Sequence, residues 1–84
     1  MKITFKLFAS LTDYLPLAAR YSNVLELDVA PDASVSQIIE PFDLPAKMVH
    51  LVLINGRYIA PEQRLTETLA EGDVLAIWPP IGGG

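Results

Sequence analysis

The sequence predicts an α+β fold, in which a mixed sheet of four to five strands packs against one main helix. Several short segments alternate apolar and polar residues, which is typical of half-buried strands, whereas one segment spaces its apolar residues as an amphipathic helix does. The 84 residues suffice for a single core. We therefore expect one domain over residues 1–78, followed by a flexible, extended C-terminal tail over residues 79–84.

Two segments near the N-terminus predict a pair of strands. Residues 2–8 read Lys-Ile-Thr-Phe-Lys-Leu-Phe, with apolar side chains at every second position, and residues 25–29 alternate in the same way before Pro31. The connection over residues 9–23 is polar in part and has room for a helical turn. We expect the two strands to pair as a wide hairpin.

A short helix is predicted next, followed by a buried strand. Ser34 or Asp32 is suited to cap the helix, because its side-chain oxygen can accept hydrogen bonds from the first turn. The apolar stripe of this helix consists of Val35, Ile38 and Ile39, and Pro41 cannot lie far inside it. Residues 48–54 are almost all apolar, which predicts a central strand that is buried on both faces.

Two turns separate the remaining strands. Asn55-Gly56 predicts a tight hairpin, because both residues tolerate the positive φ angles of a type I′ turn, and a short strand over residues 57–60 should follow. Glu71-Gly72-Asp73 predicts a turn before a last strand over residues 74–78. Pro79-Pro80 ends that strand, because proline cannot donate ladder hydrogen bonds. The predicted order is β-β-α-β-β-β.

Composition excludes several classes of function. The absence of cysteine rules out disulfides, thiolate metal sites and thiol nucleophiles, and fits a reducing cytoplasm. The 10 acidic residues outnumber the 6 basic ones, so we expect no nucleic-acid partner. Lys6 and Asp13 interrupt the apolar region that a signal peptide would need, and no apolar run is long enough to span a membrane. With one histidine and no base near its serines, the chain is not expected to be catalytic alone or to hold a metal.

The last six residues carry the most specific chemical signal. Pro79 and Pro80 hold the backbone extended, and Gly82, Gly83 and Gly84 add no side chain, so the tail is a thin probe that reaches at most ~20 Å from the domain. It could thread a narrow tunnel and present a carboxylate to the active site of another protein. A carboxylate is a poor electrophile, and adenylation by ATP followed by attack of a sulfur nucleophile would turn it into a thiocarboxylate.

This ending resembles that of a known family. Residues 72–84 read Gly-Asp-Val-Leu-Ala-Ile-Trp-Pro-Pro-Ile-Gly-Gly-Gly and are similar to the C-terminus of the ubiquitin-like β-grasp sulfur carriers. Residues 53–59 are similar to the apolar-Asn-Gly turn of that family, and the resemblance covers essentially the whole chain. The small subunit of molybdopterin synthase is the nearest branch because of the Pro-Pro pair, with the thiamine-pathway carrier as a close relative. Glycine at position 82, where the molybdopterin carriers often have a small side chain, leaves the pathway open.

The resemblance implies a mechanism and a set of partners. A ubiquitin-activating-like adenylating enzyme would use ATP to activate the Gly84 carboxylate, and a persulfide sulfur donor would convert it to a thiocarboxylate. The sulfur would then pass to a precursor held by a large synthase subunit, and the resemblance favours molybdopterin synthesis as the pathway. Gly83 and Gly82 would provide clearance in the tunnel, and the chain itself would bind no cofactor.

A group of aromatic residues suggests where these partners bind. Phe8 is in register with the polar face of the first strand, Trp78 is the last residue of the last strand, and Tyr58 follows the Asn-Gly turn. The resemblance implies that these three residues line the sheet surface that meets the activating enzyme and the large subunit, with Pro80 and Ile81 at the root of the tail. The alternative is that each aromatic ring caps an edge of the core.

Two other classes of function remain open. A ubiquitin-like modifier would join Gly84 to lysines of target proteins through isopeptide bonds, and it would share the activation step. A passive β-grasp interaction module would carry an inert tail.

Overall fold

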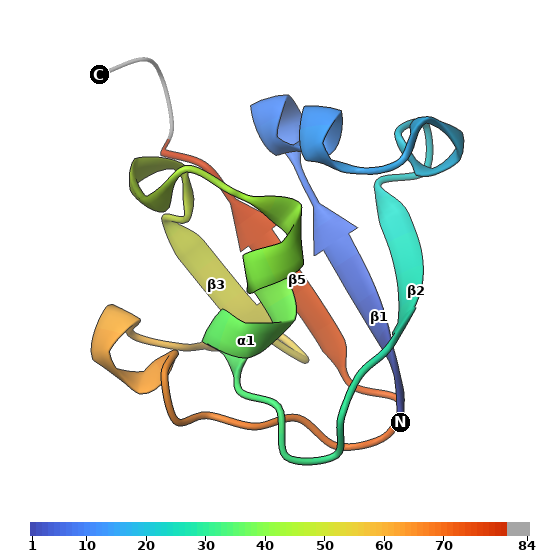
Figure 1. Ribbon diagram of the computed structural model, residues 1–84. Helices are drawn as coiled ribbons and strands as arrows, with labels where there is room; N and C mark the ends of the chain where they lie inside the picture. Colours follow the sequence, from blue (N-terminus) through green and yellow to red (C-terminus); the bar gives the residue numbers. More distant parts are fainter. Residues whose placement is uncertain (81–84) are drawn as a thin grey trace.

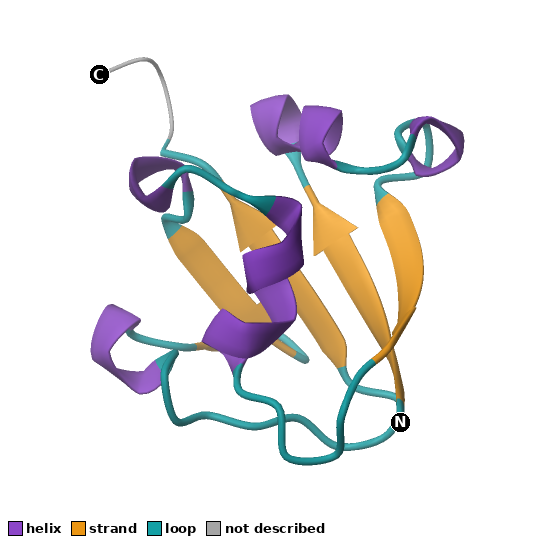
Figure 2. Ribbon diagram, viewed as in Figure 1, coloured by secondary structure: helices purple, strands orange, loops and turns teal. Residues whose placement is uncertain are grey.

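The computed structural model describes residues 1–80, and its strands form one mixed sheet in the order β2-β1-β5-β3-β4 (Figure 1). β1 pairs antiparallel with β2 and parallel with β5, and β3 pairs antiparallel with both β5 and β4. A single α-helix, α1, crosses one face of this described sheet (Figure 2). The elements are β1 (Lys2–Leu7), β2 (Val24–Asp28), α1 (Val35–Ile39), β3 (Leu51–Ile54), β4 (Arg57–Tyr58) and β5 (Val74–Trp78). The order β-β-α-β-β-β and the α+β, β-grasp fold class are thereby confirmed.

Short 3-10 helices fill the connections between these elements. The predicted long connection after β1 folds into two of them, and α1 continues directly into a third, where Pro41 has no N–H with which to extend the α-helical ladder. The 3-10 helices are η1 (Ala9–Tyr14), η2 (Leu17–Ala19), η3 (Glu40–Phe42), η4 (Ala46–Met48) and η5 (Pro61–Gln63). No helix within residues 1–80 is long and apolar enough to cross a bilayer.

Ser34, rather than Asp32, caps α1. Its hydroxyl oxygen accepts a hydrogen bond from the Gln37 N–H at 3.2 Å, and the Gln37 side-chain oxygen accepts one from the Ser34 N–H at 2.9 Å. This reciprocal capping box satisfies two backbone donors that the first turn would otherwise leave unpaired. It explains why a helix as short as α1 begins at Val35.

The core lies between α1 and the face of the sheet that α1 covers. Alternate residues of β1, β3 and β5 point into it, as the period of two requires. Phe5 is fully buried at its centre and packs against the ring of Phe42 at a centroid distance of 4.7 Å. The other large buried side chains of the core are Ile3, Leu7, Leu11, Leu15, Val35, Ile38, Val52, Ile54, Ile59, Leu69, Leu75 and Ile77.

The prediction for the apolar run at residues 48–54 was wrong in three respects: where the strand begins, where it lies in the sheet, and whether both of its faces are buried. β3 begins only at Leu51, because residues 46–48 form η4, and it lies between β5 and β4 rather than at the centre of the sheet. Val52 and Ile54 are buried, but Leu51 and Leu53 are only half-buried. In the described part of the chain no α-helix covers the second face of the sheet, so only every second residue of β3 enters the core. β4 is also shorter than predicted and ends at Tyr58.

The two predicted turns are linked to each other. Asn55 and Gly56 have φ angles of 51° and 83°, which confirms the hairpin, and the Asn55 side chain donates to an oxygen of Asp73 at 2.9 Å and accepts from the Val74 N–H at 2.9 Å. The other Asp73 oxygen accepts from the Ala70 N–H at 2.8 Å. Hydrogen bonds from Ala70 and from Asn55 lower the pKa of Asp73 below its ordinary value, although partial burial opposes them. Asp73 is thus a structural link between the two turns.

Candidate functional site

Phe8 and Trp78 form a stacked pair on the face of the sheet that α1 does not cover. The ring centroids are 4.1 Å apart and the planes are inclined by 2°. The parallel ladder of β1 and β5 explains this contact: Leu7 lies beside Ile77, and the Phe8 N–H donates to the Ile77 carbonyl at 3.2 Å, so the next residue of each strand falls side by side. Both side chains are half-buried.

Three further residues extend this pair into an apolar surface. Trp78 is paired with Leu51 of β3, and Leu53 is paired with Tyr58 of β4, so all of these side chains point to the same face. Tyr58 is 51% exposed and lies across Leu53 from β5. No ring stacking of Tyr58 is found among residues 1–80, where Phe8 and Trp78 are the aromatic residues in contact on this face. We call Phe8, Leu51, Leu53, Tyr58 and Trp78 the open-face patch.

The pattern of the sequence predicted the three aromatic members of the patch and missed the two leucines. Leu51 and Leu53 belong to a run that is apolar at every position, and such a run gives no sign of which residues face solvent. The Asn55-Gly56 turn was the available hint, because it pairs β3 with its neighbour in an antiparallel hairpin, and antiparallel sheets commonly expose one face to solvent.

The root of the tail lies directly beside the patch in the chain. Pro79, which follows Trp78, is buried, and Pro80 is exposed. The remaining predicted tail residues, Ile81, Gly82, Gly83 and Gly84, lie outside the described residues. The described chain therefore places the patch immediately before the tail.

A buried arginine holds the strand end that carries Trp78. Arg64 is only 9% exposed, and its guanidinium donates to the carbonyl oxygens of Ile59, Val49 and His50 at 3.2, 3.0 and 3.0 Å. The N–H of His50 in turn donates to the Trp78 carbonyl at 3.2 Å. Carbonyl dipoles thus replace the water that the charged group loses on burial. The sequence did not predict this role, because an arginine in a polar segment is normally exposed.

The side chains of the open-face patch are apolar or aromatic. Residues 1–80 contain no group of three side chains arranged to hold a metal ion. His50 is exposed, and its carbonyl, rather than its ring, is engaged by Arg64. Stacked, half-buried aromatic rings are the kind of surface that contributes most to protein interfaces.

Comparisons with known proteins agree with this geometry. Residues 1–82 match the family model described as Mut7-C ubiquitin. The crystal structure of SAMP1 from Haloferax volcanii is 28% identical with a TM-score of 0.66, and the match covers 100% of both chains. A putative molybdopterin converting factor, subunit 1, from Pyrococcus furiosus is 25% identical with a TM-score of 0.65, over 96% of this chain and 99% of that one.

A third structure shares the fold alone. It is the complex of subunits 1 and 2 of the molybdopterin-converting factor from Helicobacter pylori, at 16% identity and a TM-score of 0.58, with 100% of both chains covered. No curated protein matches the chain. The match over residues 1–82 and the shared fold lead to one conclusion: the chain belongs to the Mut7-C ubiquitin family, among the ubiquitin-like sulfur carriers that its sequence resembles.

Proposed function

We propose that this chain is a sulfur carrier whose Gly84 carboxylate is converted to a thiocarboxylate and donates sulfur in cofactor synthesis, with molybdopterin as the product. The observation that carries the proposal is the direct succession of the stacked Phe8–Trp78 pair and the Pro-Pro-Ile-Gly-Gly-Gly tail. An aromatic surface beside a tail that ends in three glycines suits a protein that docks on an enzyme and inserts its end into the active site. The Pyrococcus furiosus relative, a putative molybdopterin converting factor subunit, supports the same reading.

The proposed chemistry proceeds on partner enzymes. A carboxylate oxygen of Gly84 attacks the α-phosphorus of ATP, which releases pyrophosphate and forms an acyl-adenylate. The terminal sulfur of a persulfide donor then attacks the acyl carbon and displaces AMP. A second thiol cleaves the resulting acyl disulfide, is itself oxidised to a disulfide, and leaves the thiocarboxylate on Gly84. In this scheme ATP is bound by the adenylating enzyme, and this chain needs no cofactor of its own.

The open-face patch is the proposed docking surface for both the adenylating enzyme and a large synthase subunit. The complex from Helicobacter pylori, in which subunit 1 of the molybdopterin-converting factor is assembled with subunit 2, illustrates such a pairing for the same fold. Pro80 and Ile81 would extend the contact toward the active site of the partner. We place the reaction in the cytoplasm, where thiols are kept reduced.

Intact mass spectrometry after coexpression with an adenylating enzyme and a persulfide donor tests the proposal. We expect a gain of about 16 Da, from replacement of oxygen by sulfur, located in the C-terminal peptide. The matched control is a variant that lacks Gly83 and Gly84, which should gain nothing. An unchanged mass of the full chain with an active enzyme would refute the proposal, and the same spectrum shows whether the mature chain ends at Gly84.

A second candidate is conjugation to proteins, which the similarity to small archaeal modifier protein 1 of Haloferax volcanii favours. The same acyl-adenylate would then be attacked by a lysine amine of a target protein, with loss of AMP and formation of an isopeptide bond. Immunoblots of cells expressing the tagged chain distinguish the two functions. Ladders that disappear in the variant without Gly83 and Gly84 indicate a modifier, and a thiocarboxylate without ladders indicates a sulfur carrier.

A further inference from the structure

The outer edge of β2 is a free sheet edge. β2 is the first strand of the sheet and pairs only with β1 among the described residues. Met1 and Val29 exchange both backbone hydrogen bonds, at 2.7 and 2.8 Å, so the alternation of an antiparallel ladder turns the N–H and carbonyl groups of Glu26 and Asp28 outward. No hydrogen bond within residues 1–80 uses these outward groups. They are available to pair with another strand.

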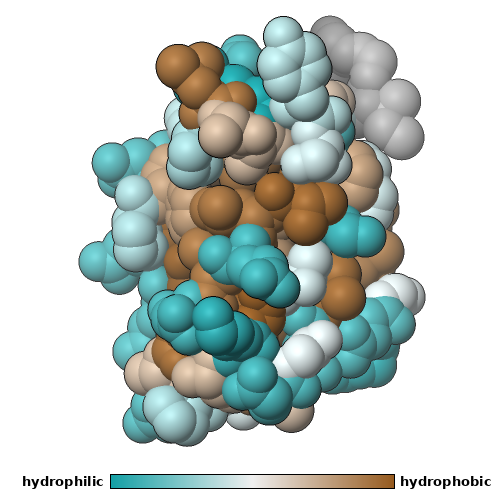
Figure 3. Space-filling model, turned by 90° about the vertical axis from the view of Figure 1, so that its right-hand side faces the viewer, coloured by the Kyte–Doolittle hydropathy of each residue, from teal (hydrophilic) through white to brown (hydrophobic). Residues whose placement is uncertain are grey.

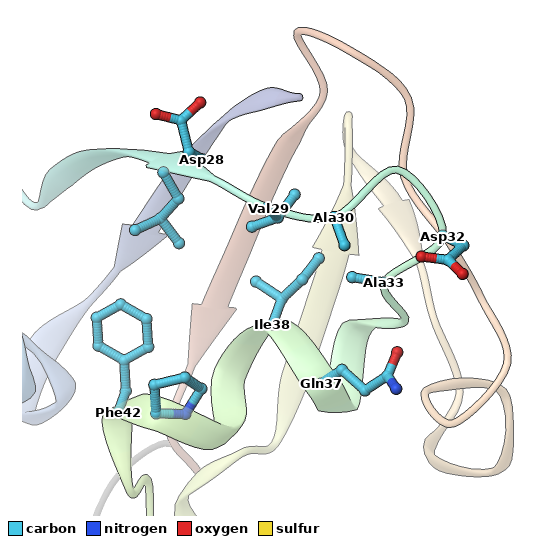
Figure 4. A pocket seen from close by; sticks show the side chains of 10 residues that line it. Asp28, Val29, Ala30, Asp32, Ala33, Gln37, Ile38 and Phe42 are labelled. Atoms are coloured by element: carbon cyan, nitrogen blue, oxygen red, sulfur yellow. The ribbon is translucent and has the colours of Figure 1, made fainter.

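An apolar groove runs beside this edge, between β2 and α1. It has a volume of about 540 Å³, and its floor and walls include Leu27, Val29, Ile38 and Phe42. Figure 4 shows Ile38 and Phe42 directed toward β2, whereas the Asp28 carboxylate points to the other side of the strand. The view onto the β2 side of the molecule shows apolar side chains gathered across the middle of this surface, with hydrophilic side chains around them (Figure 3).

The two faces of the edge differ in charge. The side chains of Leu27 and Val29 line the groove, and those of Glu26 and Asp28 point to the opposite face of the strand, where both residues are exposed. Lys2 approaches Asp28 at 3.9 Å, but both side chains are mostly exposed, so this pair screens the acidic edge only weakly. Asp32 adds a further exposed carboxylate at the end of the groove.

We infer that the β2 edge binds an extended segment of a partner protein that alternates apolar and basic residues. The segment adds to the sheet as a sixth strand by hydrogen bonding to Glu26 and Asp28. Its apolar side chains, which point to the helix side, fill the groove over Ile38 and Phe42. Its lysine or arginine side chains, which point to the other face, meet the carboxylates of Glu26 and Asp28. This site lies on the opposite edge of the sheet from β4 and is separate from the open-face patch.

The same charges disfavour a second copy of this chain as the occupant. Two β2 edges brought together would place Glu26 and Asp28 against their own equivalents, and like charges directly opposite one another destabilise strand pairing. The chain as a whole has a net charge of −4, which adds to the repulsion. A basic segment from a different protein is attracted by this edge.

Nuclear magnetic resonance titration of the isotope-labelled full chain tests this inference. The probe is a capped peptide of about eight residues that alternates valine and lysine, and the control peptide alternates valine and glutamate. We expect saturable shifts at residues that line the groove and slower hydrogen exchange of the Glu26 and Asp28 amides with the lysine peptide alone. Shifts centred on the open-face patch, equal binding of the two peptides, or no saturable shift would each overturn the proposal.

Two variants separate the contributions of charge and backbone. The double variant Glu26→Lys with Asp28→Lys should bind the lysine peptide about tenfold more weakly, because two attractive charge pairs become repulsive. The matched control, Asp13→Lys with Glu62→Lys, makes the same change of net charge at exposed sites outside the groove, and it should change affinity by about twofold or less. Equal weakening by both pairs would overturn the proposed site.

Glu26→Pro removes an outward N–H of β2 without removing a hydrogen bond to β1. We expect the sheet to remain folded, and we expect the lysine peptide no longer to slow hydrogen exchange of the Asp28 amide. If this variant loses its cooperative unfolding transition, the charge-reversal pair decides the question instead. Protection of the Glu26 and Asp28 amides that rises with protein concentration in the absence of peptide would show that a second copy occupies the edge, and would overturn the assignment to a basic partner.

Discussion

The ring of Phe8 lies flat on the indole of Trp78, with centroids 4.1 Å apart and planes inclined by only 2°. The contact joins two strands that are neighbours in the sheet but lie at opposite ends of the sequence. Because both rings are half-buried, the pair contributes to the stability of the sheet and still presents a face to solvent. Phe8 and Trp78 therefore both stabilise the sheet and belong to the proposed docking surface.

Phe8→Ala should therefore affect both stability and function. We expect the free energy of unfolding to fall by about 1–2 kcal/mol through loss of the stack and of apolar burial, as measured by urea denaturation. The rate of thiocarboxylation on coexpression with an adenylating enzyme should fall several-fold at a temperature where the variant is folded. Tyr21→Ala, which removes a side chain that is 99% exposed, is the control and should change neither quantity. An unaffected thiocarboxylation rate in Phe8→Ala would exclude the patch as the docking surface.

Arg64→Met should be among the more destabilising substitutions in the chain. It leaves the carbonyl oxygens of Ile59, Val49 and His50 without their hydrogen-bond donor in a buried setting. We therefore expect the free energy of unfolding, measured by urea denaturation, to fall by about 2–3 kcal/mol. Arg57→Met is the matched control, because Arg57 forms an exposed ion pair with Glu67 at 2.9 Å and should contribute about 0.5 kcal/mol or less. Similar losses for the two variants would contradict the role assigned to Arg64.

Asp73→Asn should make stability less dependent on pH. The pKa of Asp73 is lowered in the folded state, so its ionised form stabilises the fold above the ordinary aspartate pKa, and this contribution is lost as the pH falls through the folded-state value. At neutral pH we expect the free energy of unfolding of the wild type to exceed that of the variant by about 1 kcal/mol. The difference should shrink as the pH falls below about 4, as followed by thermal unfolding across pH. A difference that is constant across this range would contradict the prediction.

Ser34→Ala should weaken the start of α1. The hydroxyl of Ser34 is the acceptor for the Gln37 N–H, and loss of an N-cap costs about 1 kcal/mol. Ser36→Ala serves as the control, because it makes the same chemical change inside the helix, where alanine is the better helix former. The two variants are compared by chemical denaturation. If Ser36→Ala proved as destabilising as Ser34→Ala, the capping box would not explain where α1 begins.

Much of the fold could be predicted from the sequence, and the candidate site only in part. The alternation at residues 2–8 and the turn at Asn55-Gly56 each identified the element that the structure contains. The sequence offered Ser34 or Asp32 as the cap of the helix, and the structure decided for Ser34. The sequence also placed Phe8 and Trp78 on one surface, where their rings stack, and the binding of partners to that surface stays a prediction. Leu51 and Leu53 could not be assigned to that surface, because a uniformly apolar segment has no period that distinguishes its two faces.

The sequence by itself determined the local features of this protein: which segments form strands, where the helix begins, where the chain turns, and that prolines end the last strand before the glycines. These follow from residues a few positions apart, whose conformational preferences act within a single element. Only the tertiary structure decided that β5 lies at the centre of the sheet beside β1, that Arg64 binds backbone carbonyls, and that the free edge of β2 borders an apolar groove. Each of these relationships depends on segments that only the folded chain brings together. The strand order and the groove exist because one face of the sheet must be buried against α1, and Arg64 is held by carbonyls because a buried charge needs partners in place of water.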